Sequence, residues 1–196
     1  MNRNKIIGGA FIFIGLILVA IPLYYEWNQQ KEVNALEDAL SLIAQSDDES
    51  VDLSTIDDLP FTQEELKQVI ELEIPSIDLK QKVLPETTEA NLSIALTQIK
   101  PNQTPGEGNF TIAGHRGYRG DRHFRQLPEV SIGDKAILHT ATKKYVYEIT
   151  SSEVIEATKV EILEDKDNKR EITLITCTID GKERIALKGR LIDREV

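Results

Sequence analysis

The chain has 196 residues, which suits one folded domain with appendages. Hydrophobic residues make up 40% of the chain, and the formal net charge at pH 7 is -10. Residues 26–58 hold ten acidic side chains and a single base, Lys31, which leaves the remainder of the chain close to neutral. Because nucleic-acid binding needs a basic face, this distribution argues against a nucleic-acid partner.

An uncharged apolar run, residues 6–25, follows Arg3 and Lys5. Its length of 20 residues matches a helix that crosses a bilayer, which needs about 20 residues. The bases before it predict a cytoplasmic N-terminus, with everything after Tyr25 outside the cell. The alternative is a cleaved secretory signal, but such signals have a shorter apolar core, and residues 20–22 (Ala-Ile-Pro) make a poor cleavage site. We therefore predict an uncleaved signal anchor.

Two segments separate this run from the folded domain. Residues 30–46 carry apolar side chains at spacings of three and four, which predicts an amphipathic helix. Those side chains are Val33, Leu36, Leu40 and Ile43. Residues 46–60 are acidic, serine-rich and without periodicity, which predicts a flexible or loosely docked linker.

The first part of the folded domain mixes strands with one short helix. The apolar alternation of residues 72–79 is broken at Pro75, which places a strand edge or a bend there. Residues 89–99 predict a helix, with Thr87 or Thr88 as its N-cap. Residues 109–113 then predict a buried strand.

Two strand pairs complete the chain. Residues 135–139 and 145–152 predict a hairpin, and residues 171–176 pair with residues 184–192 across an Asp-Gly turn. Many short strands with turn signals and few helices indicate a mainly β fold, a small closed or half-closed barrel.

Three residues at strand ends suggest chemistry. Cys177 is the single cysteine, and an unpaired thiol in an exported protein is a candidate reactive group. Thiols attack as thiolates, so activation needs a neighbouring base or cation. His115 follows one apolar strand and is the candidate base. Arg184 begins the strand after Cys177, and its guanidinium can bind an oxyanion or a substrate backbone. The seven-residue separation leaves the register of Cys177 and Arg184 open.

Each of these residues taken alone has an inert interpretation: a buried cysteine, a solvated histidine, a surface arginine. Their combination resembles the sortases, the cysteine transpeptidases of the Gram-positive cell surface. Residues 173–177 (Thr-Leu-Ile-Thr-Cys) match the T-L-x-T-C signature of that family, residues 109–116 (Asn-Phe-Thr-Ile-Ala-Gly-His-Arg) match its histidine segment, and residues 184–187 follow at the usual distance. The resemblance covers about residues 70–194.

The resemblance implies an eight-stranded closed β-barrel with short helices, preceded by a transmembrane helix. It implies that Cys177 attacks an LPxT-G/A sorting signal after its Thr, that His115 acts as acid and base, and that Arg184 steadies the reacting centre. The partners implied are surface proteins with C-terminal LPxTG or LPxTA signals and the amine of a peptidoglycan precursor (lipid II). No metal or organic cofactor is implied. The alternatives are a secreted cysteine endopeptidase that uses water, and a non-catalytic tethered β-domain.

Within the family, the short insertions resemble class D, with class A next. The lid motif of the pilin-polymerising members, Asp-Pro-aromatic, is absent from residues 47–75. Some class A members bind calcium through acids before the cysteine strand. Glu161, Glu164, Asp165 and Asp167 fit that pattern, although a solvated acidic loop is the expectation.

The predicted organisation has four segments. Residues 1–5 are cytoplasmic, residues 6–25 form the transmembrane anchor, residues 26–60 form the extracytoplasmic helix and acidic linker, and residues 61–196 form the catalytic barrel. The expected location is the cell membrane, with a single span and the catalytic domain outside the cell.

Overall fold

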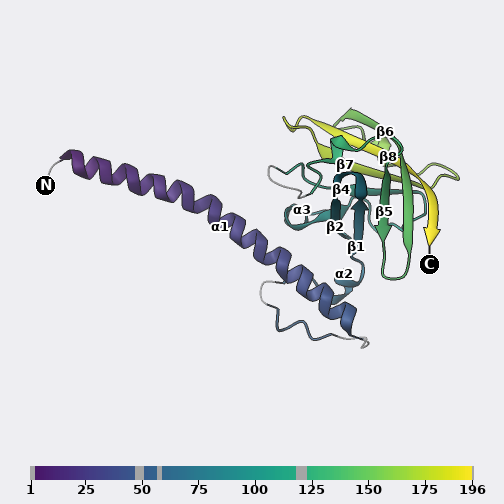
Figure 1. Cartoon of the computed structure of the whole chain (residues 1–196), viewed down its shortest axis with the longest axis horizontal. Coiled ribbons are helices and arrows are strands. Elements are labelled where there is room, and N and C mark those ends of the chain that lie inside the picture. The colour runs from purple at the N-terminus through teal and green to yellow at the C-terminus, as the bar shows by residue number, and fades with distance from the viewer. Residues whose placement is uncertain (1–2, 47–50, 57–58, 118–122, 196) are drawn as a thin grey trace. The chain divides into compact units, whose positions relative to one another are not determined.

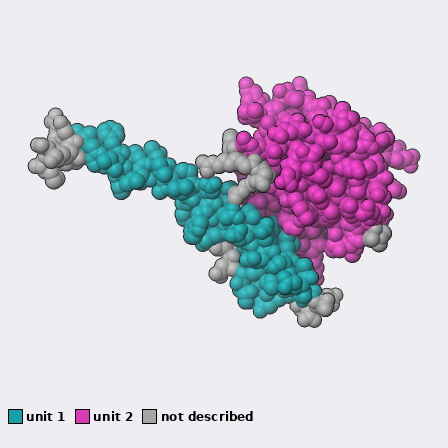
Figure 2. Space-filling view, viewed as in Figure 1, with its two compact units in different colours: residues 1–61 teal, residues 62–196 magenta. Residues whose placement is uncertain are grey.

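A computed structural model describes residues 3–46, 51–56, 59–117 and 123–195. The chain divides into two compact units, residues 1–61 and residues 62–196, which Figure 2 shows in different colours. The predicted linker, residues 46–60, falls partly outside the described residues.

The first unit is built on one long helix, α1 (Arg3–Gln45). It contains both the apolar run and the predicted amphipathic stretch, so the two are one uninterrupted helix that passes through Pro22 (Figure 1). The apolar window of this helix has a mean hydropathy of 2.4 and none of it is buried, so it meets the length and composition of a membrane span. In the second half, Leu36 is 2% exposed, and the other three residues of the predicted stripe, Val33, Leu40 and Ile43, are half-buried.

The second unit is an eight-stranded closed barrel, as predicted (Figure 1). The strands follow one another around it in the order β1-β2-β3-β4-β7-β8-β6-β5. Their bounds are β1 (Ile70–Ile74), β2 (Leu79–Leu84), β3 (Leu96–Gln98), β4 (Asn109–Ala113), β5 (Lys135–His139), β6 (Lys144–Glu156), β7 (Glu171–Cys177) and β8 (Glu183–Glu195). The β2–β3 and β4–β7 pairs are parallel and the others are antiparallel.

The helical pieces are short. They are α2 (Gln63–Lys67), α3 (Glu89–Ile94) and three 3-10 turns, η1 (Pro75–Ile77), η2 (Leu127–Glu129) and η3 (Val160–Leu163). α2 begins at a capping box in which Thr62 and Glu65 bond each other's backbone, an arrangement that stabilises a helix N-terminus. Pro75 makes the predicted bend, since η1 separates β1 from β2.

One sequence-based prediction was wrong in its extent. The predicted helix over residues 89–99 ends at Ile94, and residues 96–98 form β3 instead. Thr88 is the N-cap, and its hydroxyl accepts from the Asn91 N–H at 3.0 Å. The apolar spacing was helical, but Leu96 is fully buried in the barrel between β2 and β4, and this pairing overrides the local pattern.

The barrel interior is filled by aliphatic and aromatic side chains from all eight strands and from the segment after β4. Phe110, Phe124 and Tyr147 are its fully buried aromatic members, each at most 1% exposed. A second, smaller cluster of Ile155, Ile162 and Ala186 lies apart from this core. Among the described residues, the barrel therefore has a packed interior and a smaller apolar cluster that is separate from it.

Candidate active site

Cys177 and Arg184 face each other across one strand pair. Cys177 ends β7, and its partner in the antiparallel register is Arg184, the second residue of β8. The Thr178 N–H donates to the Glu183 carbonyl oxygen at 3.0 Å, so residues 178 and 183 are the hydrogen-bonded pair. Cys177 and Arg184 are then the adjoining non-hydrogen-bonded pair, in which side chains lie closest, with Cα atoms about 4.5 Å apart. The register that the sequence left open is therefore fixed.

Both side chains leave the barrel on its outer face. Directly paired residues share a face and successive residues alternate between faces. The next pair on the same face as Cys177 is Ile175 with Ala186. Ala186 belongs to the small second cluster, and Ile175 packs against it. Leu174 and Leu187, by contrast, belong to the barrel core. Cys177 and Arg184 are each half-buried on that outer face.

His115 follows the strand next to that of Cys177. β4 runs parallel to β7 with Ala113 opposite Ile175, the last pair of this register. The Gly114 N–H donates to the Ile175 carbonyl oxygen at 3.1 Å, which closes that pair at the end of β4. Because side chains two residues apart share a face, this register predicts that His115 lies on the face of Cys177. The His115 side chain is exposed there.

Gly114 explains why the chain before His115 is tightly fixed. A Cβ atom at this position would clash with Leu96 and would lie 2.8 Å from Cδ2 of the Phe124 ring. On the other side of the histidine, the Phe124 N–H donates to the His115 carbonyl oxygen at 2.9 Å. Glycine is thus required for close packing, and His115 is braced by two segments at once.

The threonines of the cysteine segment also have a structural task that sequence reasoning missed. The Thr176 hydroxyl donates to the Gly114 carbonyl oxygen at 2.9 Å, and the Thr173 hydroxyl donates to Oδ1 of Asn109 at 2.7 Å. Both threonines are at most 2% exposed. They tie the strand of Cys177 to the strand of His115. The available signal was two polar residues within an apolar strand, since a buried hydroxyl needs a partner.

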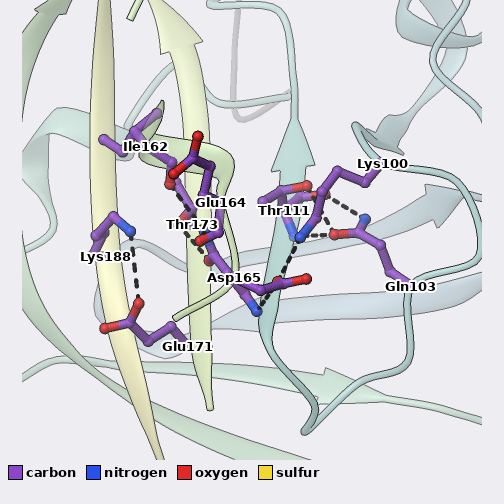
Figure 3. A network of polar contacts seen from close by, with 10 residues as sticks. Lys100, Gln103, Thr111, Ile162, Glu164, Asp165, Glu171, Thr173 and Lys188 are labelled. Atoms are coloured by element: carbon purple, nitrogen blue, oxygen red, sulfur yellow. Dashed lines mark hydrogen bonds and ion pairs between the residues drawn. The ribbon is translucent and has the colours of Figure 1, made fainter. Parts of the chain in front are cut away.

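A polar network fixes the loop that covers this face next to the site (Figure 3). The Asn109 amide nitrogen donates to the carbonyl oxygens of Ile162 and Glu164, at 2.9 and 3.4 Å. Ile162 in turn packs on Ala186, the residue of β8 that follows Arg184 on the same face. Asn109 therefore binds the loop between β6 and β7 to the sheet that carries Cys177.

The acidic residues of that loop serve the same network. The Asp165 Oδ1 atom accepts from Lys100 Nζ and from the Asn109 N–H, each at 2.7 Å. The ion pair with Lys100, followed by the Asn109 hydrogen bond, holds the pKa of Asp165 below its usual range. Among the described residues, no group of three or more His, Cys, Asp or Glu side chains is arranged to hold a metal ion. Asp165 here links two loops through Lys100.

A second ion pair lies on the same face. Lys188 Nζ is 3.7 Å from Glu171 Oε2, and both side chains are largely buried (Figure 3). Burial lowers the pKa of Lys188, and the charge of Glu171 opposes that shift. Lys188 pairs with Thr173 in the β7–β8 register, so this charge pair lies along the strands from Cys177 rather than beside it.

The Arg184 guanidinium points to the turn after Cys177. Its Nη1 atom donates to the carbonyl oxygens of Gly181 and Glu183, at 3.1 and 3.0 Å. Within the described ranges, no hydrogen bond connects the His115 ring, the Cys177 thiol and Arg184 to one another. Catalytic hydrogen bonds are often long before substrate binds, so this geometry is compatible with a site that tightens around its ligand.

The fold and these residues define a class, a β-barrel enzyme equipped for cysteine acyl transfer. The model of the sortase domain matches residues 72–192. Sortase A of Bacillus anthracis is 31% identical over 205 residues, covering 98% of this chain and 97% of that protein. The chain belongs to the sortase family and is a cysteine transpeptidase.

Two solved structures agree with this assignment. Sortase A of Listeria monocytogenes has a TM-score of 0.62 and 30% identity, covering 64% of this chain and 88% of that one. A Clostridium perfringens sortase D5 transpeptidase has a TM-score of 0.58 and 28% identity, covering 64% and 79%. Both class A and class D sortases are thus similar to this chain. The comparisons establish the family and do not determine the class.

Proposed function

We propose that Cys177 is the nucleophile of this sortase, that His115 is its acid and base, and that Arg184 binds the substrate backbone and the oxyanion. One observation carries the proposal. Cys177 and Arg184 are directly paired, and the β4–β7 register, which ends two residues before His115 with Ala113 opposite Ile175, supports a position for His115 near them. A thiol flanked by a base and a permanent cation has what acyl transfer requires.

The substrate proposed is the sorting signal LPxT-G/A of a surface protein, inferred from the family. The Cys177 thiolate attacks the Thr carbonyl carbon, and the negative charge that develops on its oxygen lies near Arg184. The C–N bond then breaks, and the His115 imidazolium gives its proton to the departing amine. A thioester between Thr and Cys177 remains, with His115 neutral.

The second half reaction reverses these roles. An amine of a peptidoglycan precursor attacks the thioester carbon, and neutral His115 takes the proton that the amine loses. The new amide forms as the Cys177 thiolate leaves, which restores the starting state of the enzyme. The acyl bond is exchanged rather than hydrolysed, so no external energy source is needed.

We further propose the four segments that the sequence predicts, with residues 6–25 in the membrane and the barrel outside the cell. The apolar window of α1 and the separate compact unit from residue 62 support this arrangement. We also infer class D as the nearer class, because the longest helix described between strands is α3, only six residues. Class A and class D enzymes assayed beside this one on the same peptides test that inference. If this enzyme preferred the same residue after Thr as the class A enzyme does, the inference of class D would be overturned.

Mass spectrometry of the full chain in detergent micelles tests the chemistry. The protein is incubated with Leu-Pro-x-Thr-Gly and Leu-Pro-x-Thr-Ala peptides, with and without an amine acceptor. We expect a thioester adduct on the single thiol that the amine resolves into a ligated peptide, and no adduct on Cys177→Ala. An adduct that only hydrolyses would favour an endopeptidase with water as acceptor. An unreactive folded protein would favour a binding domain.

A further inference from the structure

We propose that His123 is a positioning residue whose ring holds the His115 imidazole in place for proton transfer. The inference rests on the proposed function, because it concerns the acid and base of that reaction. The observation behind it is a contact between two histidine rings. Their centroids are 6.2 Å apart, and their planes meet at 89°.

This contact has the geometry that aromatic rings prefer. In an edge-to-face pair the positive edge of one ring meets the negative face of the other, with centroids about 4.5–7 Å apart. The His115 side chain is otherwise exposed on the outer face, and such a side chain changes rotamer freely. The His123 ring restricts the orientations that the His115 ring can take.

His123 itself is attached to the rigid part of the barrel. The next residue, Phe124, is fully buried in the core, and its N–H donates to the His115 carbonyl oxygen. The His123 N–H donates to the Gln81 side-chain oxygen at 3.1 Å, so β2 also holds the backbone of His123. The position of the ring is therefore fixed by backbone contacts rather than by chance packing.

The backbone at His123 is also unusual. Its φ angle is 55°, in the left-handed region that few residues other than glycine adopt. A residue in this conformation redirects the chain, and here the chain returns from the segment after His115 to lie against it. Asparagine accepts this conformation readily, so His123→Asn removes the ring without adding backbone strain.

Proton transfer requires accurate placement. His115 must reach the departing amine in one half reaction and the attacking amine in the other, from the same position. A misplacement of about 1 Å costs up to about 100-fold in rate. Loss of the ring contact should therefore lower kcat while leaving KM nearly unchanged, since His123 is not proposed to bind the sorting signal.

The test compares four full-length proteins in detergent: the parent, His123→Asn, His123→Phe and His115→Ala. We expect His123→Asn to lose about 10- to 100-fold in kcat and His123→Phe to recover most of it, with the pH profile of the parent, because phenylalanine restores the ring without a titrating nitrogen. A His123→Asn protein with parental kcat would overturn the inference. So would a His123→Phe protein that unfolds at the parental temperature and is nevertheless as impaired as His123→Asn, or that has a displaced pH profile, because His123 would then act through its nitrogens.

The His115→Ala variant separates this inference from the function it rests on. If His115→Ala turns over at the parental rate, the proposed role of His115 fails. If His115→Ala is inactive and His123→Asn is not impaired, only the role of His123 fails. A measurement without turnover covers variants that fold poorly. The chain has three histidines, so the His115 ring signal can be assigned by NMR, and it should shift or broaden in His123→Asn but stay sharp in His123→Phe.

Discussion

Arg184 lies directly opposite Cys177, so the proposed contact with the oxyanion needs a change of its side chain and no movement of the strands. One nitrogen of its fork donates to the turn carbonyls of Gly181 and Glu183, and the fork has further donors for a substrate. A lysine has one ammonium group and cannot hold the turn and the substrate in the same geometry.

Arg184→Lys should therefore lower kcat/KM by about 100- to 1000-fold, the loss typical of an oxyanion donor. Steady-state transpeptidation with a fixed amine measures it. Arg190→Lys is the matched control, because Arg190 lies in the same strand, is exposed, and pairs only peripherally with Glu148 at 3.3 Å. If Arg184→Lys turned over at the parental rate, Arg184 would not need to bind the turn and the substrate at the same time.

Individual residues of the site were identifiable from sequence because their types and order are informative. His115, Cys177 and Arg184 stand at or just after strand ends, and the structure pairs Cys177 directly with Arg184. What the sequence did not contain was the register. A turn of five residues would put a different residue opposite Cys177, and the Thr178–Glu183 hydrogen bond shows that the turn is the four residues 179–182. Contacts across the chain, such as Gly114 with Phe124, are equally invisible to local patterns.

At the scale of elements, β4 and β7 are paired strands, and Asn109 links them to the loop between β6 and β7. The Asn109 side chain is 1% exposed and takes part in three hydrogen bonds, to Ile162, Glu164 and Thr173. Its removal would leave a buried hydroxyl and two loop carbonyls without this partner, and each such buried group costs about 1–3 kcal/mol.

Asn109→Ala should lower the free energy of unfolding by about 2–4 kcal/mol, measured by chemical denaturation in detergent. Asn91→Ala serves as the control, because the Asn91 amide donates a single exposed bond to Glu86 at 2.9 Å, and it should cost less than about 1 kcal/mol. Equal losses in the two variants would show that the Asn109 network does not stabilise the loop.

Tyr147 of β6 makes the stability of the barrel depend on pH. Its hydroxyl oxygen accepts from the Gly106 N–H at 2.8 Å, and its ring is fully buried. Burial raises the pKa of Tyr147 to about 12 from an ordinary 10.0. The folded state therefore keeps a proton that the unfolded chain loses first. This contribution is complete below pH 10 and is lost as the pH rises toward 12.

The loss should amount to about 2–3 kcal/mol, since one pKa unit corresponds to about 1.4 kcal/mol. Lys188 works in the opposite sense, because its lowered pKa lets the unfolded chain bind more protons just below pH 10.5. Comparison with Tyr147→Phe isolates the tyrosine. Denaturation curves at pH 9, 10 and 11 should fall more steeply for the parent than for Tyr147→Phe, and parallel curves would contradict the assignment.

Elements were predictable where pattern and pairing agreed. The apolar segments 135–139 and 171–176, each next to a turn signal, were predicted as strands with nearly the observed bounds, and both place side chains in the core. The segment after Thr88 was different. Its apolar spacing fits a helix throughout, yet residues 96–98 pair with both β2 and β4. Helical periodicity reflects only the local spacing of apolar residues, whereas the pairing of residues 96–98 depends on contacts with the other strands of the barrel.

For the whole molecule, the length of α1 is the feature with the largest consequence. Its 43 residues span about 65 Å, whereas a bilayer core is about 30 Å thick. If residues 6–25 cross the membrane as proposed, more than half of the helix lies outside the hydrocarbon, and this part includes Leu36. In that arrangement the bases at positions 3 and 5 are expected to keep the N-terminus in the cytoplasm and the barrel outside.

Thiol labelling in protoplasts tests the orientation, because the chain has one cysteine that can be removed. In a Cys177→Ala background, Ile179→Cys places a thiol on the turn beside the site, where Ile179 is 87% exposed. Asn4→Cys places one at the opposite end of the chain. A membrane-impermeant maleimide should label position 179 in intact protoplasts and position 4 only after permeabilisation. The reverse pattern would put the barrel in the cytoplasm, where sorting signals on the cell surface are out of reach.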